Sequence, residues 1–245
     1  MHVSVGVKAG IKKQICDDTA FVNSAVINDG IHEYDPVDVA IIGVADGVGG
    51  NSGGKDASTF IAEHITNVDF KGDVAGIKEQ LYSLNNDLLE YASATPDRKQ
   101  MATTLTAILF AKGKCFLIHI GNTRMYVGQG SYLKQFTQDH TTYQWLLNRG
   151  QIEAAESCNK NEISACMGGG NQNLAAQIEV TEVFQDGLPN RLVFTSDGVH
   201  EHIEIDRLEE MVFAQKTDNE IIDEIIREVE QNGSDDDKTV VIVRK

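Results

Sequence analysis

The sequence feature that most constrains this fold is the position of aspartates at the ends of apolar runs. Asp46 directly follows the run VAIIGVA and precedes a glycine, and Asp197 follows RLVFTS and also precedes a glycine. Asp17 and Asp18 come directly before TAFV, and a further acidic run, 235–237, comes before TVVIV. Short apolar runs bounded by such residues predict buried strands. We therefore expect a sheet protein in which several loops carry carboxylates at the ends of core strands, where sheet packing can bring them together.

Carboxylates gathered at one place favour a metal site. Neighbouring carboxylates repel one another and resist ionisation unless a cation neutralises them. Hard divalent ions such as Mg²⁺ and Mn²⁺ suit a ligand set made of oxygen atoms. Two such ions about 4 Å apart can activate water and hold a phosphoryl group for in-line attack. The alternative is that these aspartates are ordinary turn residues, which are common after strands.

The apolar pattern predicts a mixed protein in which strands and helices form separate groups. Strands are expected over residues 2–7, 20–27, 39–45, 104–111, 115–120, 124–127, 175–183, 191–195 and 239–243. Helices are expected over 57–65, 74–91, 207–214 and 219–229, where apolar residues recur at helical spacing. Because strands and helices do not alternate strictly, the predicted fold class is α+β, with two stacked sheets covered by helices.

Size and charge exclude several classes of function. The chain has 245 residues, which suits one domain, and 21 basic against 37 acidic residues give a net charge of −16. That charge argues against binding to nucleic acid, which needs a basic face, and against docking on anionic lipid. The N-terminal segment lacks the apolar core of a signal peptide, and the 4 cysteines form no C-x-x-C pair. We expect a cytoplasmic protein that contacts neither nucleic acid nor membrane.

Short motifs follow one another along nearly the whole chain. They are KQICDD (13–18), DGVGG (46–50), MATTL (101–105), GNTRMY (121–126), TQDHT (137–141), SDG (196–198) and DDKTVV (236–241). Together and in this order they resemble the metal-dependent Ser/Thr protein phosphatases of the 2C type, and the bacterial-like members in particular. The resemblance implies a single domain over residues 1–245, built as a central antiparallel β-sandwich flanked by helix pairs in α-β-β-α layers.

The resemblance also implies a role for each site residue and a cofactor of two divalent ions, Mn²⁺ or Mg²⁺. The implied metal ligands are Asp46, which bridges both ions, the Gly47 carbonyl, Asp197 and Asp236 on one ion, and Asp17 on the other through water. Asp18 would orient metal-bound water. The implied activity is one-step hydrolysis of phosphoserine or phosphothreonine in proteins by a water that bridges the two metals. A monomeric hydrolase that acts in signalling, opposite a Ser/Thr kinase, is expected.

Three positions depart from the family pattern. Lys13 stands in place of the Arg that grips the substrate phosphate, and it supplies charge without a bidentate fork. Val48 replaces the His of animal members, as in many bacterial ones. Asn122 replaces an Asp that helps hold a third metal, so it marks the neighbourhood of that site. Because an amide adds no negative charge, we expect two ions rather than three.

Two other functions fit parts of the sequence. A non-catalytic member could bind a phosphoprotein or another partner with the same fold, and Lys13 and Asn122 are the residues that favour this alternative. Residues 49–55, GGNSGGK, match the G-x-x-x-x-G-K part of a nucleotide-binding P-loop. A P-loop needs Ser or Thr at the next position, whereas position 56 is Asp, which would repel phosphate.

Two further segments have simpler interpretations. His200, Glu201 and His202 could ligate a metal at alternate positions, but we expect them to be exposed after a strand. Residues 151–172 are poor in apolar side chains, and glycines lie near their end. In the 2C-type family this region carries a mobile flap beside the active site, and the composition here fits such a flap or an ordinary surface loop.

Overall fold

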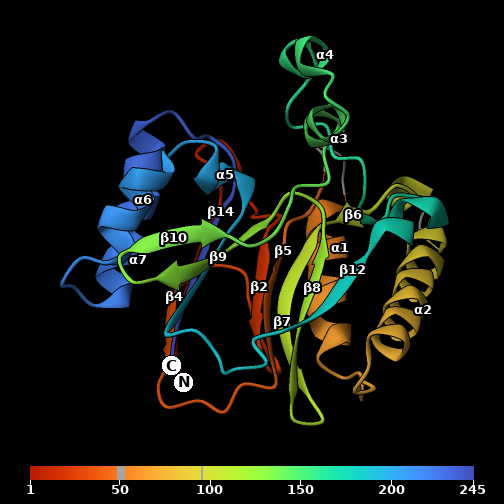
Figure 1. Cartoon of the computed structure of the whole chain (residues 1–245). Helices are drawn as coiled ribbons and strands as arrows, with labels where there is room; N and C mark the ends of the chain where they lie inside the picture. Colours follow the sequence, from red (N-terminus) through yellow and green to blue (C-terminus); the bar gives the residue numbers. More distant parts are fainter. Residues whose placement is uncertain (49–52, 95) are drawn as a thin grey trace.

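Two antiparallel sheets stacked face to face form the centre of the molecule (Figure 1). The structure, a computed structural model, describes residues 1–48, 53–94 and 96–245. In spatial order the first sheet contains β10 (Tyr132–Gln135), β9 (Arg124–Gln129), β13 (Arg191–Thr195), β14 (Lys238–Arg244), β1 (His2–Lys8) and β4 (Gly30–Tyr34). The second contains β12 (Glu179–Val183), β8 (Lys114–Ile120), β7 (Leu105–Ala111), β5 (Ile41–Ala45), β2 (Thr19–Val22) and β3 (Ala25–Ile27). A short pair joins β6 (Ala102–Thr103) to β11 (Met167–Gly168).

Helices cover both outer faces of this sandwich. They are α1 (Gly54–Ile65) and α2 (Val74–Ser93) on the second sheet, and α5 (Asp197–His200), α6 (Ile205–Val212) and α7 (Asp218–Gln231) on the first, with 3-10 turns η1 (Pro96–Arg98) and η2 (Gln172–Gln177) in connections. Figure 1 shows the helices outside the two sheets, so the expected α+β fold with α-β-β-α layers is confirmed. Within the described ranges, no helix combines the length and the apolar character needed to cross a bilayer.

Alternation along the strands divides the apolar side chains between the layers. Val3, Val5 and Val7 of β1 are buried in the cluster between the two sheets. The opposite face of β1 lies directly under α7, because a Cβ at Gly6 would come within 2.2 Å of Ile222 Cγ2. The apolar face of α7 that the sequence predicts is therefore the face that packs on the first sheet.

The observed strands differ from the expected ones where local conformation or exposure overrides the apolar pattern. Residues 20–27 form a hairpin of β2 and β3 instead of one strand, because Asn23 adopts a positive φ of 51° and its Oδ1 accepts a hydrogen bond from Ala40 N. The strand expected at 175–183 begins only at Glu179, after the turn η2. The sequence does not predict β4 or β10, which are mostly exposed strands at the edges of the first sheet.

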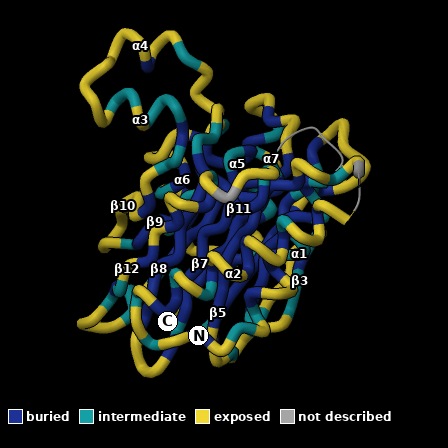
Figure 2. The backbone as a smooth tube through the Cα atoms, turned by 90° about the vertical axis from the view of Figure 1, so that its right-hand side faces the viewer, coloured by how far each residue is buried: buried dark blue, intermediate teal, exposed yellow. Residues whose placement is uncertain are grey.

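Helices α3 (Thr142–Asn148) and α4 (Ile152–Ser157) extend away from the sandwich (Figure 2). Ala155 is buried in α4, whereas α3, all of whose residues are described, buries none. The base of this segment is held by backbone hydrogen bonds from Thr142 N to Glu162 O and from Ser164 N to His140 O. The segment projects from the end of the sandwich at which α5 and β6 lie (Figure 1).

Candidate metal centre

Strand pairing places the predicted aspartates side by side within each sheet. In the second sheet Thr19 of β2 lies opposite Ala45 of β5, so Asp18, just before β2, is a neighbour of Asp46, just after β5. In the first sheet β13 and β14 are also antiparallel, so Asp197, which opens α5 after β13, lies near the acidic run that precedes β14. Antiparallel pairing thus makes neighbours of strand ends that are distant in sequence.

One hydrogen bond joins these two pairs across the sandwich. The Thr239 hydroxyl, on β14 of the first sheet, donates to Asp18 Oδ2 at 2.7 Å, next to β2 of the second sheet. Asp18 is buried, and this burial raises its pKa to about 7, although the Thr239 hydrogen bond acts in the opposite direction. The nearby charges of Asp237 and Asp197 raise the pKa of Asp18 as well. Carboxylates from both sheets therefore converge on one place.

Asp46 and Asp197, which come shortly after β5 and β13, each precede a glycine because the backbone there has no room for a side chain. A Cβ at Gly47 would lie 2.4 Å from Gly54 O, and Gly47 N donates to Asp17 O at 3.2 Å. A Cβ at Gly198 would lie 2.0 Å from Asp237 O. The two Asp-Gly pairs of the sequence thus mark close backbone contacts between strand ends.

Asp46 lies at the centre of the cluster. Burial raises the pKa of its carboxyl group well above the usual value, and the charges of Asp18, Asp197 and Asp236 raise it further. Its Oδ2 is buried and has no hydrogen-bond partner in the described part of the chain. A buried carboxylate oxygen that lacks a partner is costly, and a bound cation would remove that cost.

Asn122 adds a second unpaired oxygen beside Asp197. Its side-chain Nδ2 donates to Asp197 Oδ2 at 3.0 Å, and Asn122 is 2% exposed. Its Oδ1 is buried and accepts no hydrogen bond from any described residue. Burial, followed by the charge of Asp236, raises the pKa of Asp197. The residue that the sequence associates with a third metal therefore contacts the aspartate cluster.

Asp17 and Lys13 form the partly exposed side of the cluster. Asp17 Oδ1 accepts a hydrogen bond from Lys55 N at 3.1 Å, near the start of α1. Lys13 Nζ donates to Asp236 Oδ1 at 2.8 Å and to Asp237 Oδ2 at 2.9 Å. Burial lowers the pKa of Lys13, but these bonds outweigh that effect and raise it, so the ammonium group stays charged. The aspartates that the resemblance implies as site residues are thus brought together with Lys13: Asp17, Asp18, Asp46, Asp197 and Asp236.

Asp237 and Lys55 belong to this cluster but are not predicted as site residues. Asp237 is buried and accepts hydrogen bonds from Gly10 N and Asp17 N, each at 2.7 Å, so it fixes the segment that carries Lys13. The acidic run before β14 was the available signal, but consecutive aspartates do not reveal which side chain points inward. Lys55 Nζ is buried without a hydrogen-bond partner among the described residues, and burial lowers its pKa.

The expectation that His200 is exposed is wrong. His200 closes the short helix α5 and is 8% exposed, with its Nδ1 at 3.0 Å from Thr195 Oγ1. Burial lowers its pKa well below the usual value, so the imidazole is neutral. The reason is local geometry: the helical turn after β13 directs the side chain back to the end of that strand. Glu201 is exposed, as expected, and His202 is half-buried.

The loop after Asp46 is described only in part. Residues 49–52 lie outside the described residues, and they carry the end of DGVGG and most of the P-loop-like GGNSGGK. Asp56, at the position where a P-loop requires Ser or Thr, is described, and its Oδ2 lies 3.0 Å from Arg98 Nη1. That position therefore holds an acidic side chain in an ion pair.

The residues at this end of the sandwich fit hard divalent ions. The available donors are oxygen atoms of carboxylates, of a backbone carbonyl and of an amide, which Mg²⁺ and Mn²⁺ prefer. Burial is the largest cause that raises the pKa values of Asp18, Asp46 and Asp197, and neighbouring carboxylate charges add to it, so a bound cation would favour the ionised forms. The unpaired oxygens of Asp46 and Asn122 show that it also lacks partners within the described chain.

Known proteins resemble this chain in sequence and in fold. A family model described as Protein phosphatase 2C matches residues 12–237. The chain is 27% identical over 218 residues to the serine/threonine phosphatase stp of Listeria monocytogenes, and the match covers 84% of each chain. The Mycobacterium tuberculosis serine/threonine phosphatase PstP/Ppp has a similar crystal structure, with a TM-score of 0.77 at 25% identity, and the match covers 99% of this chain and 98% of that one. The catalytic domain of PstP in complex with 2 manganese ions matches with a TM-score of 0.72 at 23% identity, over 99% of this chain and 98% of that one.

Proposed function

We propose, from the premise that this chain belongs to the protein phosphatase 2C family, that it hydrolyses phosphoserine and phosphothreonine in proteins with the help of two divalent ions. The family match extends over residues 12–237, and a relative that covers most of the chain is named a serine/threonine phosphatase. The chain is accordingly an enzyme, a serine/threonine protein phosphatase. The metal mechanism goes further and rests on the geometry of the aspartate cluster.

The observation that carries the mechanism is Asp46 Oδ2, which is buried and has no partner among the described residues, where strand ends of both sheets meet. Such an oxygen supports a ligand that bridges two Mn²⁺ or Mg²⁺ ions. The proposed ligands are Asp46, the Gly47 carbonyl, Asp197 and Asp236, with Asp17 acting through water. When bound, two such ions lower the pKa of water and neutralise phosphoryl oxygens.

Other residues of the chain would position the reactants. Asp18 is held by the Thr239 hydroxyl, and we assign it the role of accepting a hydrogen bond from the attacking water. Lys13 stays charged and partly exposed, so we assign it to the substrate phosphate. To reach the phosphate, its ammonium group would exchange a carboxylate partner for a phosphoryl oxygen.

We assign the activity to a single domain that spans residues 1–245, because β1 pairs with β14 and so joins the two ends of the chain in one sheet. Figure 1 shows both termini at the same end of the sandwich. The proposed substrate is a phosphoprotein produced by a Ser/Thr kinase in signalling. The monomeric state and the cytoplasmic location stay predictions of the sequence.

Hydrolysis of a phosphothreonine peptide tests the proposal. The wild-type protein should release phosphate with Mn²⁺, and EDTA should abolish this activity. Asp46→Asn and Asp197→Asn should each lower kcat/KM by about 1,000-fold, since metal ions contribute several kcal/mol to the reaction. The control is Asp87→Asn, which removes an exposed carboxylate of α2 and should leave activity unchanged. Activity that survives both EDTA and the two substitutions would contradict the mechanism, and folded protein without any activity would favour the phosphoprotein-binding alternative.

A further inference from the structure

A second cluster of titratable side chains lies at the opposite end of the first sheet. His2 begins β1, and its partner Arg244 is the last residue of β14. Asp236 and Asp237 of the candidate metal centre precede the other end of β14. Because this seven-residue strand is extended, roughly 20 Å separates the two places. The second cluster is therefore independent of the phosphatase centre.

Strand pairing puts three potential ligands of this cluster on one face. Ser4 of β1 lies opposite Glu33 of β4, so His2 lies opposite Asp35, just beyond the end of β4. Residues two apart in a strand share a face, so the side chains of His2, Glu33 and Asp35 lie on the same side of the sheet. The contact at Gly6 shows that α7 covers this side.

The three side chains already lie close to the separations of metal ligands. His2 Nδ1 is 3.3 Å from Asp35 Oδ2 and 3.9 Å from Glu33 Oε1, and the three donor atoms lie within 4.8 Å of one another. Two ligands of a tetrahedral zinc ion, with bonds of about 2.0–2.1 Å, lie roughly 3.4 Å apart. Both carboxylates are exposed, so rotation of their side chains can close the remaining distance.

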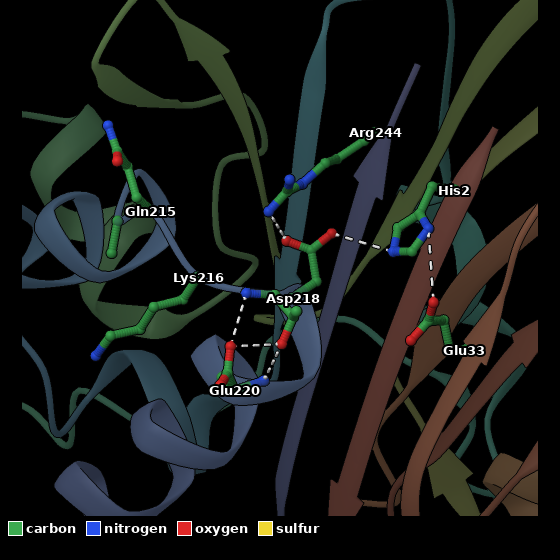
Figure 3. A pocket seen from close by; sticks show the side chains of 9 residues that line it. His2, Glu33, Gln215, Lys216, Asp218, Glu220 and Arg244 are labelled. Carbon is green, nitrogen blue, oxygen red and sulfur yellow. Dashed lines mark hydrogen bonds and ion pairs between the residues drawn. The ribbon is translucent and has the colours of Figure 1, made fainter.

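The other nitrogen of the His2 ring faces a buried carboxylate. Figure 3 shows the imidazole between Glu33 on one side and Asp218 on the other. His2 Nε2 lies 3.4 Å from Asp218 Oδ2, and Ser4 Oγ lies 3.3 Å from the same nitrogen. The Asp218 side chain is 1% exposed, and its Oδ1 is paired with Arg244. Its Oδ2 accepts no hydrogen bond from residues within the described ranges.

This arrangement determines which ring nitrogen can bind a metal. A histidine that ligates a metal through one nitrogen usually donates its other N–H to a carboxylate, which fixes the tautomer. If Nε2–H of His2 points to Asp218, the lone pair of Nδ1 points to Glu33 and Asp35. A lone pair that faces two carboxylates is unfavourable, and either a proton on Nδ1 or a cation between the three groups relieves it. Arg244 neutralises Asp218, which leaves the two exposed carboxylates to balance a dication.

We propose that His2 Nδ1, Glu33 and Asp35 bind one transition-metal dication of the zinc class. One imidazole nitrogen and two carboxylates suit Zn²⁺ better than Mg²⁺. A cavity of about 710 Å³ opens beside His2, and His2 and Glu33 are among the residues that line it, so solvent can reach these two side chains (Figure 3). The bound ion would tie the edge strand β4 to β1 and to the first turn of α7.

Zinc binding by the full-length chain tests the proposal. The experiment uses the double variant Asp46→Asn, Asp236→Asn, which removes metal uptake at the phosphatase centre. Zinc bound by this variant therefore reports on the second cluster and does not depend on the proposed function. Equilibrium dialysis with ZnCl₂ should then give one bound zinc per chain. His2→Ala should abolish this binding. The matched control is His32→Ala on β4, which points to the opposite face from Glu33 and should retain the zinc.

Further measurements distinguish a specific zinc site from incidental zinc binding. Asp218→Asn should weaken zinc binding by 10- to 100-fold, the usual loss when the outer partner of a ligand is removed. Glu33→Gln, at an exposed position, tests a ligand directly and does not depend on the folding of the Asp218 variant. Imidazole ¹⁵N NMR should show a shift of His2 Nδ1 when zinc is added. Each of three results would overturn the proposal. They are equally tight zinc binding after His2→Ala, no zinc binding by the Asp46→Asn, Asp236→Asn double variant, and no shift of the His2 signal when zinc is added.

Discussion

At the scale of single residues, the candidate centre is defined by two oxygens that need a partner. Asp46 Oδ2 and Asn122 Oδ1 are both buried, and neither has a hydrogen-bond partner in the ranges that the structure describes. A buried acceptor left unpaired costs about 1–3 kcal/mol. Asn122 also donates to Asp197, so it can offer its Oδ1 as an uncharged ligand while it orients a charged one. Because the amide adds no negative charge, two ions rather than three stay the prediction for this centre.

Lys13 is the residue at which substrate binding and the stability of its own loop are linked. Lys13→Met removes the charged hydrogen bonds to Asp236 and Asp237. It also removes the proposed bond from the ammonium group to the substrate phosphate. A charged hydrogen bond is worth about 1.5–3 kcal/mol, so we predict that the KM for phosphopeptide rises roughly tenfold, with a smaller change in kcat. Because the ammonium group is partly exposed, the free energy of unfolding should fall by only about 1 kcal/mol. Steady-state kinetics and urea denaturation measure the two effects.

The neighbouring Lys12 provides the matched control for this prediction. Its Nζ lies 2.7 Å from Asp235 Oδ2, in an ion pair at the surface. Solvent screens such a pair, so Lys12→Met should change neither KM nor stability appreciably. Lys13→Arg should lower KM, because a guanidinium group can bind phosphate through two hydrogen bonds. An equal rise of KM in both Met variants would mean that only the general surface charge matters.

At the scale of elements, the α3–α4 segment packs little against the sandwich, since α3 buries no residue and α4 buries only Ala155. The loop that follows α4 donates a hydrogen bond from Asn161 Nδ2 to Glu201 Oε2, at 2.7 Å, which links the segment to the end of α5. We predict that Asn161→Ala speeds amide exchange in α3 and α4 and raises KM, while Tm stays nearly unchanged, because local opening breaks few buried contacts. Hydrogen exchange and kinetics test this expectation.

Ser157→Ala is the control for that prediction, since the Ser157 hydroxyl donates to Glu153 O within α4 itself. It should alter neither exchange at the base of the segment nor KM. If Asn161→Ala leaves exchange unchanged, the bond to Glu201 does not hold the segment.

The elements also show which parts of the fold the sequence predicts. Buried strands such as β13 are predicted with the correct bounds because apolar side chains on both faces leave a continuous run. The edge strand β4, GIHEY, is mostly exposed and owes its conformation to pairing with β1, so no local pattern predicts it.

The prediction of the site from the sequence has the same limit. Asp46 and Asp197 stand out at strand ends, whereas the inward orientation of Asp237 depends on contacts with Gly10 and Asp17 that only tertiary structure provides.

At the scale of the whole molecule, metal binding should be linked to pH through the buried acids. In the metal-free folded protein the pKa of Asp18 is raised to about 7 from 3.8, mainly by burial. The folded state therefore holds a proton that the unfolded chain has released between about pH 4 and pH 7. This contribution to stability is complete below pH 4 and is lost as the pH rises toward 7. Burial lowers the pKa of His119 to about 4 and that of His200 well below its usual value. The stability that these two histidines contribute therefore rises with pH, whereas the contribution of Asp18 falls.

Comparison of the metal-free and Mn²⁺-bound forms isolates the acids, because both histidines contribute equally to each form. Metal ligands must lose their protons before they bind, so Mn²⁺ restores the stability that ionisation of the buried acids removes. We predict that the increase in Tm caused by Mn²⁺ grows steadily between pH 5 and pH 7, and that Asp18→Asn makes this increase less dependent on pH. Thermal denaturation in EDTA and in Mn²⁺ at each pH measures the difference. A Tm increase that is constant from pH 5 to pH 7 would show that the acids are already ionised without metal, and that the cluster is neutralised by groups of the chain itself, such as Lys13 and Lys55.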